Sequence, residues 1–170
     1  MKYPYLLFDA DNTLFDFDKA ERRAYDNVCR THGLACSDSG YALYRQCNGE
    51  LWHDFDRGLC TKEFILVERF RRYLDRSGQS AQPEALNRTH LETIANSAFL
   101  LPGALELCRT LAADHALYII TNGVEASQRS RFQLSPLVPY FKDMFISEAV
   151  GCGKPSRAYF DYVFQAVPGL

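Results

Sequence analysis

Three short apolar runs along the chain predict buried β-strands. Apolar residues fill consecutive positions in each run, so both faces of each strand should be covered, as in a parallel sheet between helices. Each run is followed by a polar or turn-prone stretch and then by a helical pattern, which predicts the βαβ order of a doubly wound α/β fold. Ligands of such folds bind beyond the carboxyl ends of the strands. The runs are Tyr5–Phe8, Ala116–Ile120 and Asp143–Ser147.

A long segment with helical periodicity separates the first two predicted strands. Apolar residues recur at helical spacing in four stretches, and the first three end at Gly33, Gly58 and Gly78. The fourth stretch starts near Pro83. Four amphipathic helices can form a small bundle. We therefore predict an α/β core, residues 1–16 and 99–170, with a four-helix cap, residues 17–98, inserted after the first strand.

The composition is typical of a globular chain without a strong overall charge. Its 170 residues are 47% hydrophobic, and 19 basic against 21 acidic side chains give a formal charge of −2. This balance provides no overall positive electrostatic potential that would attract nucleic acid or an anionic membrane. No apolar run approaches the roughly 18 residues of a membrane span, and the start, MKYPYLLFDAD, becomes acidic too early for a secretory signal. We expect a cytoplasmic protein with a small-molecule partner, and the sequence indicates no particular oligomeric state.

Neither the cysteines nor the histidines are spaced for a metal site. No two of the six cysteines form a C-x-x-C pair, and no two of the four histidines stand four residues apart with an acid between them. Several cysteines fall on apolar helical positions. We therefore expect reduced thiols rather than a disulfide or zinc framework, and no histidine metal site.

Acidic, hydroxyl and basic residues follow the three predicted strands. Asp9 and Asp11 come after the first strand, and residues two apart point the same way if the extended backbone continues. Thr121 ends the second strand at a predicted helix start, where free N–H groups can bind an anion. Lys154 precedes Pro155, which suits the first turn of a helix, so the lysine opposes the macrodipole and an anionic ligand explains it better. On position alone, either aspartate could instead cap a turn or helix.

In this order, the motifs resemble those of the haloacid dehalogenase superfamily of aspartate-nucleophile phosphohydrolases. Residues 9–14, DADNTL, match its first motif, Thr121 its second and Lys154 its third. The resemblance covers the whole chain, including a helical cap after the first strand, and implies a Rossmann-like parallel sheet. Within the first motif, Thr13 would help to fix the loop. Asp18, beyond it, is placed to cap the first cap helix.

The resemblance implies a role for each motif residue. Asp9 would attack phosphorus and form an aspartyl-phosphate, and Asp11 would protonate the leaving group and later deprotonate the attacking water. Mg²⁺ would be held by the Asp9 carboxylate and the backbone carbonyl of Asp11. Lys154, Thr121 and the Asn122 amide would hold the phosphoryl oxygens.

The same residues narrow the substrate class. Asp11 favours a phosphatase over a dehalogenase, because an ester oxygen leaves with a proton and a halide does not. Four stretches further resemble the bacterial pyrimidine 5′-nucleotidases of the superfamily: Asn48–Ile65, NGELWHDFDRGLCTKEFI, together with TNGVEASQRSRF (121–132), FKDMFISEAVG (141–151) and KPSRAYFDYVF (154–164). This resemblance implies a nucleoside 5′-monophosphate as substrate. Asn48 could hydrogen-bond a base edge and Trp52 could stack on the base, although helical spacing also suits Trp52 to core packing.

The superfamily's fourth motif, an acidic loop after a further strand, has no counterpart before Leu170. We expect the chain to be a truncated form of a longer protein, with the sheet incomplete at the C-terminus. The third acidic ligand of Mg²⁺ would then be missing, and the first strand would lie at an open sheet edge. Glu148 is expected to be a structural strand-end residue rather than a substitute ligand.

Two other functions stay open. A phosphoacceptor signalling domain also gathers acids, a threonine and a lysine at strand ends, but it needs no helical insertion. A catalytically weak or silent chain could bind a phosphate ligand without turnover. We predict a Mg²⁺-dependent nucleoside 5′-monophosphatase of nucleotide metabolism, and multiple turnover separates it from both alternatives.

Overall fold

The computed structural model describes residues 3–167 and 169 and forms two compact units. One unit, the α/β unit, contains Met1–Ala20 and Ile94–Leu170, and the other, the helical unit, contains Glu21–Thr93. The divisions fall inside α1 (Phe17–His32) and α4 (Pro83–Ala95). The predicted domain limits at residues 16 and 98 stay a prediction. Within the described residues, no helix is both long enough and apolar enough to cross a membrane.

The α/β unit is built on a three-stranded parallel sheet in the order β1-β2-β3, which confirms the predicted parallel sheet. Leu7 of the first strand pairs with Tyr118 of the second. The third strand begins at Phe141 rather than at Asp143, because the buried ring of Phe141 packs edge-on against Phe8. The strands are β1 (Tyr5–Phe8), β2 (Ala116–Thr121) and β3 (Phe141–Ile146).

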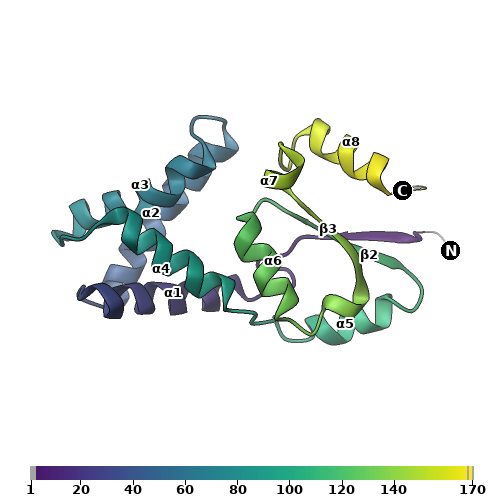
Figure 1. Ribbon diagram of the computed structural model, residues 1–170, viewed down its shortest axis with the longest axis horizontal. Helices are drawn as coiled ribbons and strands as arrows, with labels where there is room; N and C mark the ends of the chain where they lie inside the picture. Colours follow the sequence, from purple (N-terminus) through teal and green to yellow (C-terminus); the bar gives the residue numbers. More distant parts are fainter. Residues whose placement is uncertain (1–2, 168, 170) are drawn as a thin grey trace. The chain divides into compact units, whose positions relative to one another are not determined.

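Helices cover both faces of this sheet (Figure 1). Side chains of β2 alternate, so that Leu117 and Ile119 join one core while Tyr118 and Ile120 join the other. The consecutive apolar residues of the predicted strands therefore reflect burial on two sides. The first core is closed by α5 (Ala104–Leu111) and α6 (Glu125–Gln133), and the second by α7 (Ser147–Val150) and α8 (Arg157–Ala166).

The helical unit contains most of α1 and α4 together with α2 and α3, and the four predicted helices are confirmed. Their ends follow ordinary capping chemistry. The Ser37 hydroxyl accepts a hydrogen bond from Gly40 N, and the Thr61 hydroxyl accepts one from Phe64 N. Gly78 ends α3 at φ 67°, a left-handed conformation that favours glycine. The central helices are α2 (Asp38–Asp56) and α3 (Lys62–Ser77).

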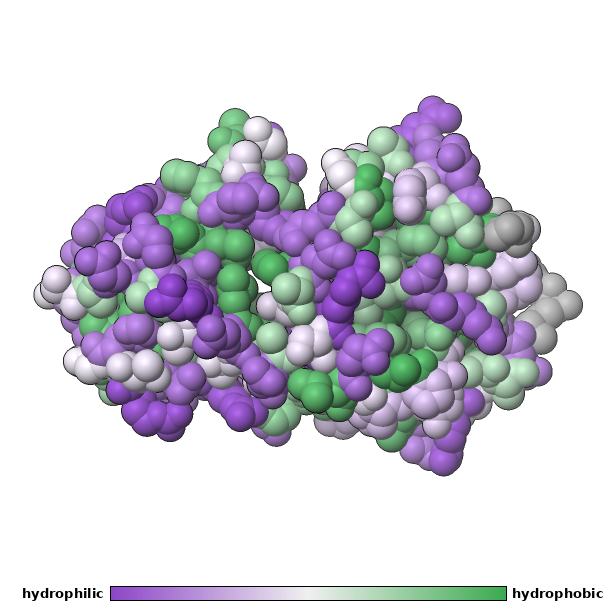
Figure 2. All heavy atoms as spheres, in the orientation of Figure 1, coloured by the Kyte–Doolittle hydropathy of each residue, from purple (hydrophilic) through white to green (hydrophobic). Residues whose placement is uncertain are grey.

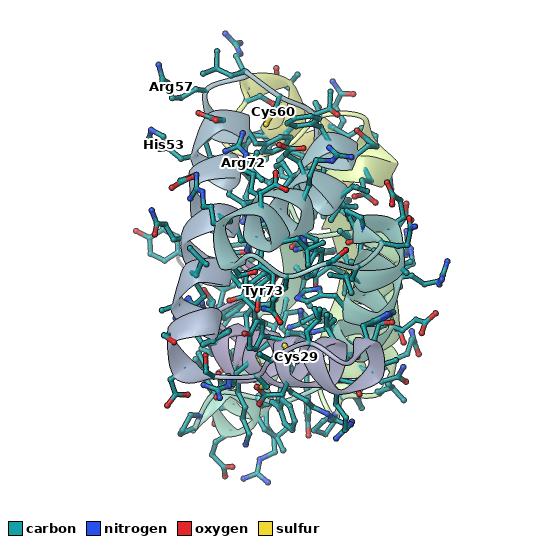
Figure 3. All side chains as sticks on the ribbon, turned by 90° about the vertical axis from the view of Figure 1, so that its left-hand side faces the viewer. Cys29, His53, Arg57, Cys60, Arg72 and Tyr73 are labelled. Carbon is teal, nitrogen blue, oxygen red and sulfur yellow. The ribbon has the colours of Figure 1, made fainter. Side chains whose placement is uncertain are left out.

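The interior of the helical unit is aromatic. The hydroxyls of Tyr25 and Tyr73 lie 2.9 Å apart in the buried core. Figure 3 shows Tyr73 and Cys29 inside the bundle, whereas His53 and Arg57 project outward. Hydrophilic residues cover much of the visible surface of the helical unit (Figure 2), as expected of amphipathic helices that bury their apolar faces. All six cysteines of the chain are free thiols.

Two glycines of α2 provide a matched test of this packing. A β-carbon at Gly40 would lie 2.4 Å from the Tyr25 hydroxyl, whereas one at Gly49 would meet nothing within 4 Å. We expect Gly40→Ala to lower the free energy of unfolding by about 1–3 kcal/mol through overpacking. Gly49→Ala should raise it by roughly 0.5–1 kcal/mol through better helix propensity. Urea denaturation measures both, and a shift of the same sign in the two variants would contradict the packing described.

The start of α1 differs from the predicted cap. The helix begins at Phe17, so Asp18 lies within its first turn. Asp16 Oδ1 instead accepts a hydrogen bond from Lys19 N at 2.9 Å, and Asn12 Oδ1 accepts one from Phe17 N at 3.1 Å. The capping prediction for Asp18 is therefore wrong, because the helix starts early enough for Asp16 to satisfy its first N–H groups.

Candidate active site

The predicted nucleophile lies just beyond the carboxyl end of β1. The side chain of Asp9 is 47% exposed, and its Oδ1 atom lies 2.8 Å from the Nζ atom of Lys154, which follows β3. Asp9 Oδ1 also accepts a hydrogen bond from Ala10 N at 2.8 Å. The structure thus brings the first and third motifs together at one end of the sheet. A half-exposed carboxylate beside a cation can approach an anionic group that the cation attracts.

The segment after β2 holds this lysine in place. Thr121 is buried, and its hydroxyl accepts a hydrogen bond from Gly123 N at 3.1 Å. Asn122 Nδ2 donates to the Lys154 carbonyl at 2.8 Å, and Lys154 N donates to Asn122 Oδ1 at 2.9 Å. A β-carbon at Gly153 would lie 2.6 Å from that same Oδ1 atom, so glycine leaves room for the pair. The Asn122 side chain therefore positions Lys154, and phosphate binding by Asn122 stays a prediction for its main-chain N–H.

Lys154 does not stand at a helix start, contrary to the prediction. Helix α8 begins at Arg157, and the Ser156 hydroxyl caps it by accepting a hydrogen bond from Tyr159 N. Pro155 therefore precedes the cap instead of occupying the first turn. The reason is that serine offers an acceptor for the first N–H groups, which proline cannot. The Asp9 carboxylate supplies a negative charge beside Lys154, and the anionic ligand stays a prediction.

The loop after Asp9 is fixed by its backbone and by buried rings. Leu14 N and Phe15 N both donate to the Ala10 carbonyl, at 3.0 and 2.9 Å, and all three residues are fully buried. Asn12 adopts a left-handed conformation with φ 56°, which asparagine tolerates better than most residues. Thr13 is exposed, and its hydroxyl makes no hydrogen bond to the described residues. The predicted supporting role of Thr13 stays a prediction, while the Asn12 amide oxygen accepts a hydrogen bond from Phe17 N at 3.1 Å.

Asp11 faces a different set of partners from Asp9. Arg131 Nη1 donates to Asp11 Oδ1 at 2.7 Å, and Gln128 Nε2 donates to Asp11 Oδ2 at 2.6 Å. Strand β1 ends at Phe8, so the alternation that would point both aspartates the same way does not extend to Asp11. Both of its carboxylate oxygens are instead bonded to helix α6.

Sequence reasoning missed Gln128 and Arg131. They stand three residues apart in QRSR, and residues at this spacing share one face of a helix. A glutamine and an arginine on a short polar helix ordinarily indicate a solvated face, yet their exposed fractions are only 2% and 0%. The helical spacing after TNG was the available signal, but it does not reveal a partner more than a hundred residues earlier.

The substrate residue predicted in the helical unit, Asn48, has protein partners at both ends of its amide. Its Nδ2 atom donates to Glu21 Oε1 at 3.0 Å, and its Oδ1 atom accepts from Arg69 Nη1 at 3.4 Å. Arg69 also bonds the ring of His90, and burial together with the nearby guanidinium holds the pKa of that histidine well below its usual value. This buried polar network gives the Asn48 amide partners within the protein, and a base-binding role for Asn48 stays a prediction.

Trp52, the second tentative substrate residue, is half-buried in α2. Its ring meets that of Phe55 edge-on, with centroids 5.5 Å apart. This arrangement agrees with the packing alternative that helical spacing suggested. A stacking role for Trp52 stays a prediction.

Comparison with known proteins identifies the protein family of this chain. A model of the haloacid dehalogenase-like hydrolases matches residues 3–168. The chain belongs to this family. It is 35% identical to YfnB of Bacillus subtilis over 98% of its own length and 71% of that protein. It is also 34% identical to the pyrimidine 5′-nucleotidase PynA of Streptococcus pneumoniae, covering 100% of this chain and 72% of PynA.

Solved structures of haloacid dehalogenase-like proteins confirm the fold. A crystal structure of YfnB bound to magnesium superposes with a TM-score of 0.94 at 34% identity, covering 99% of this chain and 74% of that chain. The L-2-haloacid dehalogenase of Xanthobacter autotrophicus has a TM-score of 0.70 at 16% identity, covering 97% of this chain and 65% of that one. At that identity the likeness concerns the fold alone. The α/β fold with a helical insertion is thereby established for this member of the family.

The half-exposed carboxylate beside β1 is of the chemical type that binds a hard divalent cation such as Mg²⁺. Mg²⁺ keeps several waters and is commonly held by one or two carboxylates together with substrate phosphate. The Asp9 carboxylate is such a group, and the Asp11 carbonyl as a second ligand stays a prediction. No cluster of three or more acidic, histidine or cysteine residues suited to a metal occurs among the described residues. Glu148 accepts a hydrogen bond from Glu125 N at the start of α6, at 2.8 Å, and its structural rather than metal-binding role stays a prediction.

Proposed function

We propose that this haloacid dehalogenase-like hydrolase is a Mg²⁺-dependent phosphomonoesterase that acts on nucleoside 5′-monophosphates. The single observation that carries the proposal is the Asp9 carboxylate, half exposed at the strand end and 2.8 Å from the Lys154 ammonium group. An ionised carboxylate is available at neutral pH as a nucleophile toward phosphorus. The ammonium group offsets the repulsion between that carboxylate and the phosphate dianion.

The first half-reaction transfers the phosphoryl group to the chain. An Asp9 oxygen forms a bond to phosphorus while the bond from phosphorus to the ester oxygen breaks. Asp11 gives a proton to the departing alkoxide. Lys154 and Thr121 hold phosphoryl oxygens in place. Bound Mg²⁺, held by the Asp9 carboxylate and the Asp11 carbonyl, would neutralise charge on the phosphoryl oxygens.

The second half-reaction returns Asp9 to its starting state. Water attacks phosphorus, Asp11 takes its proton, and the bond between phosphorus and Asp9 breaks to release inorganic phosphate. Asp11 thereby ends each cycle protonated again, because the proton from water replaces the one that it gave to the leaving group. A halide leaves without a proton, so this use of Asp11 favours phosphate esters over haloacids as substrates.

Pyrimidine nucleotides are the preferred substrates in this proposal. Support comes from PynA and from the pyrimidine 5′-nucleotidase YjjG of Escherichia coli, which is 31% identical over 97% of this chain and 72% of its own length. Both relatives match nearly the whole chain, including the helical unit.

Release of phosphate from UMP, dUMP and dTMP tests the proposal. We expect multiple turnovers with Mg²⁺ and loss of turnover with EDTA, restored by excess Mg²⁺. The kcat/KM for these substrates should exceed that for AMP by about tenfold or more, a factor that pocket contacts can supply. Absence of phosphate release from all of them would contradict the proposal, and equal rates for UMP and AMP would contradict the base preference.

A further inference from the structure

We propose that Arg131 and Gln128 are positioning residues that hold the Asp11 carboxyl group where it can protonate the leaving group. The inference rests on the proposed function, because that function gives Asp11 a proton to transfer. Neither residue touches the reacting atoms in this scheme. They act through Asp11, from the buried face of α6.

The two donors leave the Asp11 carboxyl group little rotational freedom. Arg131 Nη1 bonds Oδ1 at 2.7 Å and Gln128 Nε2 bonds Oδ2 at 2.6 Å. A carboxyl group bonded at both oxygens by two separate side chains is fixed in rotation about its own axis as well as in position. The Asp11 side chain remains 27% exposed. Donors from α6 therefore hold the carboxyl group, while part of the side chain stays accessible to solvent.

The Arg131 side chain is itself held in place by two aromatic rings. It is fully buried, and its guanidinium carbon lies 4.6 Å from the centroid of the Phe15 ring and 5.7 Å from that of Phe17. Both rings belong to the segment just after Asp11. Its Nε and Nη2 atoms have no hydrogen-bond partner among the described residues. Among the described residues, Asp11 is thus the hydrogen-bond acceptor of this buried cation. The two rings pack against the guanidinium group and restrict its movement toward another acceptor.

Gln128 reaches Asp11 only because position 123 lacks a side chain. A β-carbon at Gly123 would lie 2.1 Å from Gln128 Nε2 and 2.8 Å from its Cδ atom. The glutamine side chain therefore passes directly over the glycine backbone. The Asp11 carboxyl group is thus bound by a buried arginine and a buried glutamine. The glycine at position 123 leaves room for the glutamine.

The dependence on the leaving group distinguishes positioning of Asp11 from general support of the fold. A nucleoside alkoxide needs a proton to depart, whereas p-nitrophenolate is a stable anion and departs without one. A misplaced Asp11 should therefore impair phosphoryl transfer from UMP much more than from p-nitrophenyl phosphate. The kcat/KM reports only steps up to departure of the leaving group, so it excludes the later hydrolysis step that the two substrates share.

The experiment compares kcat/KM for UMP and p-nitrophenyl phosphate in four variants of the whole chain. We expect Arg131→Met to lower the UMP value by about 10- to 100-fold, part of what a general acid contributes, and to change the p-nitrophenyl phosphate value by less than about threefold. Gln128→Ala should shift the ratio in the same direction by roughly three- to tenfold. Arg131→Lys, which keeps the charge but not the planar fork, should recover part of the loss. Arg129→Met is the matched control, since Arg129 lies on the same helix, 54% exposed, and pairs with Glu125.

Each outcome decides the inference. Equal losses with the two substrates, no loss, or a gain with UMP would overturn it, and so would the same selective loss in Arg129→Met. Near-ultraviolet circular dichroism checks folding, and if Arg131→Met does not fold, the ratio in Gln128→Ala decides alone. Failure of the parent chain to hydrolyse either substrate would contradict the proposed function itself, and the inference would fall with it.

Discussion

Asp9→Asn is expected to lower phosphate release from UMP, dUMP and dTMP at least about a thousandfold, as loss of a nucleophile does in other covalent mechanisms. An amide oxygen is a far weaker nucleophile than a carboxylate, and the substitution also removes the charge that would bind Mg²⁺. Stability should change little, because the side chain is 47% exposed and its ion pair with Lys154 is open to solvent. Phosphate assays at saturating substrate, with urea denaturation in parallel, measure both effects.

Asp143→Asn is the matched control for this substitution. Asp143 Oδ1 accepts a hydrogen bond from the next backbone N–H, that of Met144, at 2.7 Å, just as Asp9 Oδ1 accepts from Ala10 N at 2.8 Å. The two aspartates therefore share a local geometry, but Asp143 lies within β3. Its substitution should leave turnover within about twofold of the parent. Full activity in Asp9→Asn would exclude Asp9 as the nucleophile.

Asp11→Ala is expected to lower the free energy of unfolding by about 3–5 kcal/mol, which is large for a residue with a catalytic role. The reason lies in its partner. Arg131 is fully buried, and its ion pair with Asp11 is 2.7 Å long. Removing the carboxylate leaves a buried guanidinium without a counter-charge, which is costlier than removing an exposed partner. Urea denaturation of the parent and the variant measures the difference.

A double-mutant cycle isolates this effect. Arg131→Met replaces the cation with an apolar chain of similar length, so removing Asp11 in that background should cost less than about 1 kcal/mol. Asp11→Asn should be milder than Asp11→Ala, because its amide oxygen can still accept from Arg131. Gln128 Oε1, which has no hydrogen-bond partner among the described residues, can turn to accept from the nitrogen of that amide. A loss below about 1 kcal/mol in Asp11→Ala alone would contradict the role of the ion pair.

The architecture could be predicted because its signals are local. Leu117 and Ile119 face one core while Tyr118 and Ile120 face the other, so a strand covered on both sides appears in the sequence as an unbroken apolar run. The parallel arrangement then places residues that follow different strands at the same end of the sheet. The closeness of Asp9 and Lys154 follows from that rule, although they are far apart in the sequence.

Details that depend on competition between neighbouring groups were predicted less well. Pro155 and Ser156 both suit a helix start, and only the hydroxyl supplies the hydrogen bond that decides between them. The same holds for Asp16 and Asp18 at α1. In each case the sequence offers two acceptable positions for the helix start, one or two residues apart.

Partners brought together by tertiary packing could not be predicted. Gln128 and Arg131 lie 117 and 120 positions after Asp11 in the sequence. On a short helix their polar side chains read as a solvated face, and nothing local reveals that they are buried. Asn48 is a similar case, because its partners Glu21 and Arg69 come from other helices.

The central claim is that Asp9 becomes phosphorylated while Asp11 handles the protons, and Asp11→Asn with p-nitrophenyl phosphate tests it most directly. The leaving group of this substrate needs no acid, so Asp9 should be phosphorylated, but hydrolysis of the aspartyl-phosphate should stall without a base. We predict a rapid burst of nitrophenolate of about one equivalent per chain, with the phosphate recovered on the Asp9 peptide after acid quenching. Steady turnover without a burst, or phosphate on any other residue, would contradict the account.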